Sequence, residues 1–308
     1  FNGPVTLLEN VSFASSGTGR ISFNDTVDGT QNLTLNPGSG IVEFNTVVGG
    51  SIPLNNLLVQ GDITTSNPTG VNIRTVNNII TGNITSPGGI ALSSSSRDIT
   101  TGILNSSSLG NAGNISLEAR GAIALSQIDA QSLGSGWGGN VDITANNFFQ
   151  TSNSFVDRNG INASISTAGG ADGGTIVVRH GGGGITPFTV GNSDTNGTQR
   201  AMTRGNAAPE QTILPTQSYL FTYTQDSDRI QIISTAPPPP LPPDPTPIPP
   251  PITPSPITPP PIASFTQPTL PFPEPILLPG RERNPLESLA FLVGDTLNAQ
   301  TQIEQDRK

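Results

Sequence analysis

Several residue types are absent or scarce in this sequence of 308 residues, and each absence excludes a class of function. There is no cysteine, which excludes disulfides and thiolate metal sites. Charged residues make up 11% of the chain and Lys308 is the only lysine, so the sequence lacks the basic face that nucleic-acid-binding proteins use. The net charge of −9 also disfavours binding to an anionic membrane surface. No apolar run approaches the roughly 18 residues of a membrane-spanning helix, so we expect no membrane insertion.

Aromatic residues are also scarce, at 5%, whereas turn-forming residues are abundant. The chain contains 35 glycines and 30 prolines, and serine, threonine and asparagine are common. This composition favours turns and short strands over helices. The sequence starts at Phe1 and shows no basic-then-apolar signal segment, so we expect a piece of a longer exported protein. A chain without cysteine suits passage through a cell envelope in the unfolded state.

One glycine-led motif occurs three times between residues 109 and 180. Each copy follows a glycine-rich run and alternates apolar with polar positions, as a short strand does. The copies are Gly113-Asn114-Ile115-Ser116-Leu117, Gly139-Asn140-Val141-Asp142-Ile143 and Gly174-Thr175-Ile176-Val177-Val178. Such self-similarity indicates a repeat architecture whose unit is a strand.

Short alternating strands separated by turns fill the rest of residues 1–185, with about three strands between one glycine-led motif and the next. This spacing predicts a right-handed parallel β-helix with coils of roughly twenty to thirty residues. Three strands make one coil, and the coils stack about 4.8 Å apart with aliphatic columns inside. Glycine and asparagine are expected at corners that need positive φ. A β-sandwich is the alternative, but it usually carries more aromatics and regular hairpins.

The sequence divides into four regions. Residues 1–185 are predicted as the parallel β-helix, and residues 186–235, which hold both tyrosines, as C-terminal capping strands. Residues 236–283 are a proline-rich linker, expected to be extended polyproline II. Residues 284–308 are expected to form a short amphipathic helix that begins a missing region, with Pro285 at its first turn.

Further motifs lie at residues 109–117, 161–167, 169–178, 187–192, 196–198, 215–218 and 230–233. They resemble segments of the filamentous-haemagglutinin family, and the resemblance covers residues 1 to about 235. These proteins are exoproteins of two-partner secretion, and this chain looks like the cyanobacterial type. The resemblance implies a β-helix fold, a secreted or cell-surface location and an outer-membrane transporter as export partner. It also implies a proline linker and helices that lead to a caspase-like CHAT domain. The family's N-terminal secretion domain is not visible in this sequence.

An enzyme must be considered, because polysaccharide lyases and hydrolases also use parallel β-helices. They need clustered carboxylates and a basic residue. The aspartates lie one per segment, and Asp129 and Asp157 illustrate a pair that stacking could align. The series is Asp62, Asp98, Asp129, Asp142, Asp157 and Asp172. We therefore expect no catalysis, and keep a polysaccharide-processing enzyme as an alternative.

Two further motifs are candidates for metal or catalytic sites. His180, the only histidine, is expected at a solvent-facing corner, and one histidine without cysteine is a poor zinc site. The run from Gly169 to Gly174 resembles the calcium-binding nonapeptide of repeat toxins but lacks its repeated register, so it is predicted to be a plain turn. We expect no metal and no cofactor. The Asn-x-Ser/Thr triplets are attributed to composition; they begin at Asn10, Asn24, Asn32, Asn83, Asn105, Asn114, Asn162 and Asn196.

Trp137, the only tryptophan, lies in the turn Gly136-Trp137-Gly138-Gly139 and is the one candidate for ligand contact. An exposed indole ring can stack on a sugar. Packing of the ring against a neighbouring loop is the other interpretation.

These patterns favour an exported, rod-like structural or adhesive surface protein that presents loops or assembles into an extracellular filament. Its expected partners are further copies of itself, a glycan or other cell-surface ligand, and the transporter during export. The alternatives are the polysaccharide-processing enzyme and a sensor module ahead of a caspase-like protease.

Overall fold

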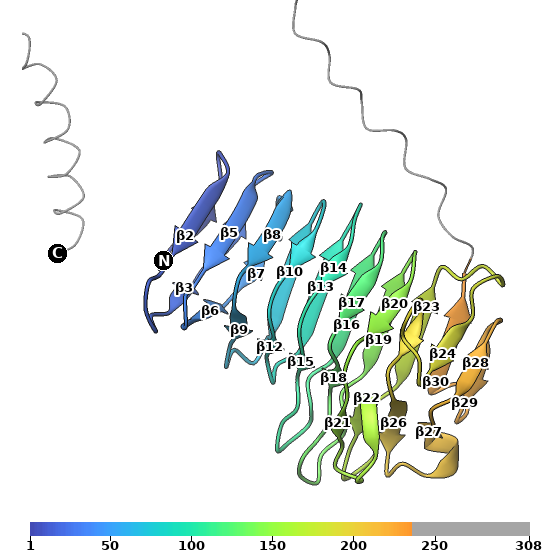
Figure 1. Cartoon of the computed structure of the whole chain (residues 1–308). Coiled ribbons are helices and arrows are strands. Elements are labelled where there is room, and N and C mark those ends of the chain that lie inside the picture. The colour runs from blue at the N-terminus through green and yellow to red at the C-terminus, as the bar shows by residue number, and fades with distance from the viewer. Residues whose placement is uncertain (236–308) are drawn as a thin grey trace, which may run out of the picture. The chain divides into compact units, whose positions relative to one another are not determined.

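The computed structural model describes residues 1–235, and these form a parallel β-helix (Figure 1). The chain passes through three ten-stranded sheets in turn, which we call sheets A, B and C. Sheet A has the order β1 (Val5–Thr6), β4 (Val27–Asp28), β7 (Val47–Val48), β10 (Val71–Thr75), β13 (Ile90–Ser94), β16 (Ile115–Ala119), β19 (Val141–Ala145), β23 (Ile176–His180), β30 (Ile230–Ser234) and β29 (Tyr223–Gln225).

The other two sheets complete each coil. Sheet B has the order β2 (Val11–Ala14), β5 (Asn32–Asn36), β8 (Asn56–Val59), β11 (Ile79–Ile80), β14 (Ile99–Thr100), β17 (Ile123–Leu125), β20 (Phe149–Thr151), β25 (Gly197–Thr198), β24 (Phe188–Val190) and β28 (Gln217–Tyr219). Sheet C has the order β27 (Thr212–Ile213), β26 (Ala201–Gly205), β22 (Asn162–Ala168), β18 (Ile128–Asp129), β15 (Leu104–Asn105), β12 (Ile84–Thr85), β9 (Asp62–Thr64), β6 (Ile41–Phe44) and β3 (Ile21–Phe23), with β21 (Phe155–Val156) paired to β22. One 3-10 turn, η1, spans Pro209–Gln211.

The three glycine-led motifs are stacked neighbours in sheet A, as predicted. They form β16, β19 and β23, which pair in parallel with Ile115 opposite Val141 and Val141 opposite Ile176. Inward side chains of these strands form aliphatic columns, and those of Leu117, Ile143 and Val178 are at most 1% exposed. Period-two alternation therefore fills the interior with like side chains from successive coils.

The glycines of the motif are required by close approach of the backbone between coils. The N–H groups of the three glycines bond back to the preceding sheet C strand, within one residue of its end, at 2.8 to 3.1 Å: Gly113 to Ser106, Gly139 to Ala130 and Gly174 to Thr167. A Cβ atom on Gly139 would lie 2.0 Å from the carbonyl oxygen of Gly113, and one on Gly174 would lie 2.1 Å from that of Gly139. None of these three glycines has positive φ, so the predicted reason was wrong at these positions.

Asparagine side chains connect successive coils. Asn114 Oδ1 accepts from the backbone N–H of Asn140 at 2.9 Å, and Asn140 Oδ1 accepts from that of Thr175 at 2.9 Å. A second ladder joins Asn10 to Asn32, where the same type of bond measures 3.0 Å. No asparagine in residues 1–235 has positive φ. The abundance of asparagine therefore has a structural cause that composition alone did not reveal.

The β-helix ends in a β cap, as predicted. Strands β25, β26 and β30 continue sheets B, C and A in parallel. Strands β28, β27 and β29 then pair antiparallel with β24, β26 and β30. The predicted linker (236–283) and helix (284–308) lie outside the described residues. Within residues 1–235 there is no helix with the length and hydropathy to span a membrane.

Candidate functional site

The most prominent surface feature is a ridge of loops that connect sheet C to sheet A in three successive coils. We define this loop ridge as residues 106–113, 130–139 and 168–174, and Figure 1 shows loops extending past the sheets beside β15 and β18. Backbone hydrogen bonds stack the loops on each other: Leu133 N–H donates to Ser108 at 2.8 Å, and Ala171 N–H donates to Gly136 at 3.0 Å. The ridge is therefore an ordered extension of the β-helix.

Three large apolar side chains on this ridge are exposed to solvent. Leu109 is 81% exposed, Leu133 is 52% exposed and Trp137 is 55% exposed. The backbone of Trp137 is bonded twice to the preceding loop, because its N–H donates to Asn111 Oδ1 at 3.0 Å and its carbonyl accepts from Ala112 N–H at 2.9 Å. The exposed indole is thus mounted on a fixed backbone, which lowers the entropic cost of binding. Its contact with a ligand stays a prediction.

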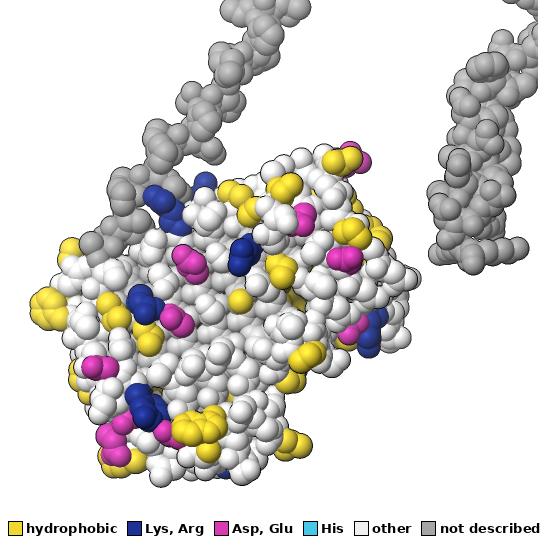
Figure 2. Space-filling model, turned by 180° about the vertical axis from the view of Figure 1, so that it is seen from behind, with side chains coloured by type: hydrophobic (Ala, Val, Ile, Leu, Met, Phe, Trp, Pro, Cys, Tyr) yellow, Lys and Arg dark blue, Asp and Glu magenta, His cyan; other side chains and the backbone are white. Residues whose placement is uncertain are grey.

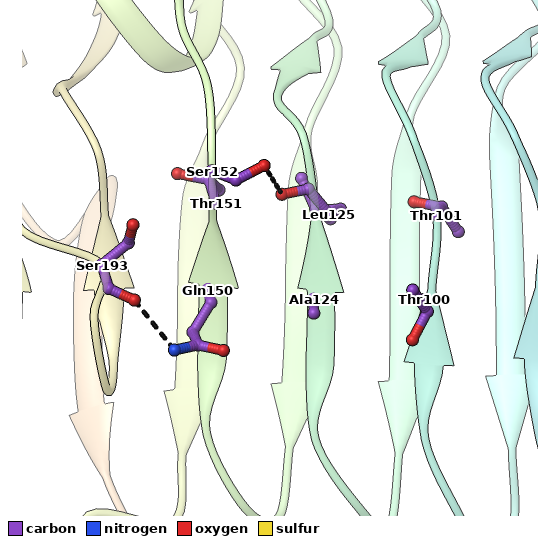
Figure 3. A pocket seen from close by; sticks show the side chains of 8 residues that line it. All are labelled: Thr100, Thr101, Ala124, Leu125, Gln150, Thr151, Ser152 and Ser193. Atoms are coloured by element: carbon purple, nitrogen blue, oxygen red, sulfur yellow. Dashed lines mark hydrogen bonds between the residues drawn. The ribbon is translucent and has the colours of Figure 1, made fainter.

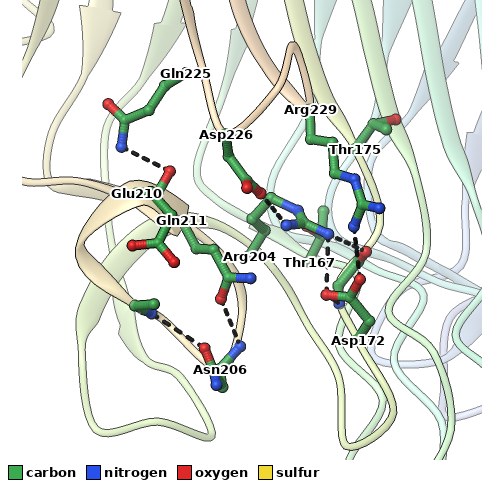
Figure 4. A network of polar contacts seen from close by, with 12 residues as sticks. Thr167, Asp172, Thr175, Arg204, Asn206, Glu210, Gln211, Gln225, Asp226 and Arg229 are labelled. Carbon is green, nitrogen blue, oxygen red and sulfur yellow. Dashed lines mark hydrogen bonds and ion pairs between the residues drawn. The ribbon is translucent and has the colours of Figure 1, made fainter.

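Beside Trp137, the turn from Gly169 to Gly174 carries an ion-pair network (Figure 4). Asp172, which bridges to Trp137 through the backbone, accepts from Arg204 Nη2 at 3.0 Å and from Arg229 Nη1 at 2.6 Å. The Arg204 side chain is 1% exposed and also bonds Asp226 and the carbonyl oxygens of the turn. The Asp172 carboxylate therefore faces two guanidinium groups, a setting that suits a closed corner and opposes cation binding.

The same contacts set the charge state of Asp172. Burial by itself would raise the pKa of this carboxyl group, but the hydrogen bond from Gly173 N–H and the nearby Arg229 and Arg204 outweigh it. The net effect is a pKa below the ordinary value, so the carboxylate stays ionised at neutral pH.

The prediction that His180 faces solvent was wrong. It occupies the last inward position of β23, two residues after Val178, and is fully buried. Its Nδ1 atom accepts from Gly182 N–H at 3.1 Å and from the side-chain amide of Asn196 at 2.9 Å, so the proton lies on Nε2. Among residues 1–235, Nε2 has no hydrogen-bond partner, and burial lowers the His180 pKa to about 4. The imidazole is a neutral core group with no access to substrate.

Asp129 and Asp157 do lie close enough to influence each other, as stacking allowed. Burial is the main cause of the raised pKa of Asp129, and hydrogen bonds from Gln131 oppose it, while the charge of Asp157 adds a smaller rise. However, Asp157 is only 4% exposed and its carboxylate already accepts from the Thr203 hydroxyl at 2.7 Å and from Ile161 N–H at 2.9 Å. These bonds occupy the second carboxylate that a glycosidase pair would need.

Shallow hollows lie on the outer surface, and two of them lie over stacked strands of the β-helix. One, on sheet B, has a volume of about 320 Å³ and lies over β14, β17 and β20 (Figure 3). The other, on sheet A, has a volume of about 370 Å³ and lies over β10, β13 and β16. Sequence reasoning missed both, because each depends on the register between coils.

Comparison with protein-family models, curated proteins and solved structures found no match, so the resemblance to filamentous haemagglutinins rests on the sequence motifs alone.

Proposed function

We propose that this chain is an exported, rod-like structural or adhesive surface protein of the filamentous-haemagglutinin type, and that it presents the loop ridge to a glycan or another cell-surface ligand. The observation that carries the proposal is the exposure of Leu109, Leu133 and Trp137 on stacked, hydrogen-bonded loops. A folded core does not need these apolar side chains in water, whereas a contact surface does. In this proposal the protein is secreted or held at the cell surface, and an outer-membrane transporter exports it.

The charge distribution supports a neutral partner. Figure 2 shows acidic and basic side chains scattered among one another on the face it presents, without a large patch of one sign. The net charge of −9 further disfavours polyanionic partners. Binding through apolar and polar contacts therefore fits this surface better than electrostatic capture.

Assembly into fibres is the second form of the proposal, and the cap makes it the less favoured one. The outermost strands at the C-terminal end are β27, β28 and β29, with two or three residues each. Short edge strands are a known protection against end-to-end pairing. Electron microscopy of the purified chain distinguishes the forms, since growth into fibres would show self-association and single short rods would favour loop presentation.

Adhesion can be measured with beads that carry the full chain and are applied to cell surfaces or glycan-coated plates. Trp137→Ala should lower bead retention at least several-fold, because it removes the largest apolar surface of the ridge. Phe221→Ala is the matched control, as this aromatic residue is 69% exposed but lies outside the ridge. Equal loss with both variants, or no loss with Trp137→Ala, would refute the ridge as the contact surface.

The alternatives have their own assays. The enzyme alternative is tested by incubating the purified chain with pectin and other acidic glycans. Release of reducing or unsaturated ends would support the enzyme and contradict the adhesive proposal. For the sensor module, the coding sequence beyond Lys308 would have to encode a caspase-like protease.

A further inference from the structure

We infer that the hollow on sheet B is a binding site for a neutral, unbranched oligosaccharide, separate from the loop ridge. The inference rests on the proposed function only in that it assigns a ligand class to an adhesive surface. It stands on the position of the hollow, its lining and its unused hydrogen-bonding groups.

The hollow follows from the register of three stacked strands. Thr100, Ala124 and Gln150 occupy equivalent outward positions on β14, β17 and β20. Because the alanine is the smallest of the three, a depression one strand wide opens above it, between walls two strand spacings or roughly 10 Å apart. The side chains that form it are drawn in Figure 3.

The cap provides the end wall of the hollow. Residues 191–196 connect β24 to β25 and lie against β20, where Gln150 Nε2 donates to the carbonyl oxygens of Ser193 at 2.8 Å and Asp194 at 3.0 Å. Both donor positions of this amide are used, so its orientation is fixed and Oε1 remains an acceptor. The wall is therefore formed before any ligand arrives, which reduces the cost of binding.

The lining combines apolar surface with hydrogen-bonding groups, as a sugar-binding site does, and it carries no charge. Ala124 supplies apolar surface, while Thr100, Gln150 and Ser152 supply hydroxyl and amide groups around it. Within residues 1–235 the Thr100 hydroxyl and Gln150 Oε1 have no hydrogen-bond partner. A pyranose offers C–H groups to the apolar surface and hydroxyl groups that both donate and accept. None of the eight lining side chains is ionised, so nothing in the lining rewards a charged ligand.

Size and lining set the expected strength of binding. The volume of about 320 Å³ lies at the lower end of the range for small-molecule sites, roughly 300–1,000 Å³. The lining holds no aromatic ring for stacking, so affinity should be weak, with a Kd on the order of 1 mM. Weak sites suit a surface protein displayed in many copies, because multivalent attachment multiplies their effect.

The sheet A hollow provides a matched control within the same chain. Its floor is Ala91, which faces outward from β13 as Ala124 faces outward from β17. In contrast with the sheet B hollow, it carries Arg74 and Glu118, which pair in register with Ser93 from either side. A neutral sugar should therefore prefer the sheet B hollow over this charged one.

The test is titration of the full chain with cellohexaose, xylohexaose and mannohexaose, with binding monitored by ligand-observed NMR. Hexagalacturonate serves as the acidic comparison. Ala124→Gln fills the hollow with an outward side chain and should weaken binding of the neutral hexasaccharides at least ten-fold. Thr100→Val keeps the shape but removes the hydroxyl, and should weaken binding about five-fold. Ala91→Gln should leave the affinity unchanged.

The proposal is overturned if wild-type protein binds none of the three neutral hexasaccharides at 10 mM, a concentration about ten times the expected Kd. It is also overturned if hexagalacturonate binds more tightly, or if Ala91→Gln weakens binding as much as Ala124→Gln. Unchanged melting temperatures show that the variants remain folded. Trp137→Ala should keep hexasaccharide affinity, so loss of bead adhesion in that variant tests the ridge and not the hollow.

Discussion

The buried His180 makes a specific prediction about stability and pH. Its pKa in the folded state is about 4, compared with an ordinary value of 6.5, because the neutral ring is buried and the charged ring is not tolerated there. Between these values the unfolded chain binds more protons than the folded chain, so stability falls as the pH falls from 6.5 to 4. The difference of about 2.5 pKa units corresponds to a loss of about 3 kcal/mol, complete below pH 4.

The assay is urea unfolding of the full chain at a series of pH values between 7.5 and 4, with unfolding detected by intrinsic fluorescence. The control variant is His180→Gln, which keeps an acceptor for Gly182 and Asn196 but does not titrate in this range. The wild type should lose about 3 kcal/mol more than His180→Gln across the window. Comparing how the free energy of unfolding changes with pH in the two proteins removes any pH-independent destabilisation that the substitution causes. Parallel pH profiles for the two proteins would refute the buried, neutral assignment.

Three further predictions concern the coil contacts and the ridge. Arg204→Ala should lower the free energy of unfolding by about 3–5 kcal/mol, measured by urea unfolding, because it leaves the Asp226 carboxylate without its guanidinium partner and Asp172 with Arg229 alone. Arg120→Ala on the surface should lower it by under about 0.5 kcal/mol, and similar losses would contradict the network. Gly139→Ala should lower the free energy of unfolding by at least about 2 kcal/mol, because the new Cβ atom would clash with the backbone of the neighbouring coil. Gly110→Ala should be nearly neutral, since the nearest atom to its Cβ would be 3.9 Å away. Equal shifts in melting temperature for the two variants would argue against close stacking. Trp137→Ala should change the free energy of unfolding by less than about 0.5 kcal/mol, and a larger loss would mean that the indole packs structurally.

The fold was predictable because its signal is local and repeated. Alternating strands such as Ile115 to Leu117 identify the inward face, and glycine before each strand marks the corner. Coils of unequal length do not change this pattern, because the variation lies in the loops between strands.

The errors come from contacts made one coil away. His180 shares the parity of Ile176 and Val178, so alternation would have placed it inside had the strand been continued to its end. The bonds from Asn114 to Asn140 could not be predicted, because the sequence separation between partners varies from coil to coil.

The candidate sites were less predictable than the fold. The exposure of Trp137 depends on how loops from three coils stack, and the charge of Asp172 is matched by arginines that the cap brings from distant positions. Likewise, the sheet B hollow needs both the register of Ala124 and the loop at residues 191–196, which follows a break in the repeat.

Disulfide trapping tests the stacking of coils most directly, because the chain has no cysteine of its own. Ser116 and Asp142 are opposite partners on neighbouring strands, whereas Ser116 and Val177 are separated by one whole coil. Adjacent strands lie about 4.8 Å apart, within the Cα separation that a disulfide tolerates, and two spacings exceed it. After mild oxidation, peptide mass spectrometry should find a disulfide in the Ser116→Cys, Asp142→Cys protein and none in the Ser116→Cys, Val177→Cys protein. The reverse result, or equal trapping of both pairs, would contradict the β-helix and the surface built on it.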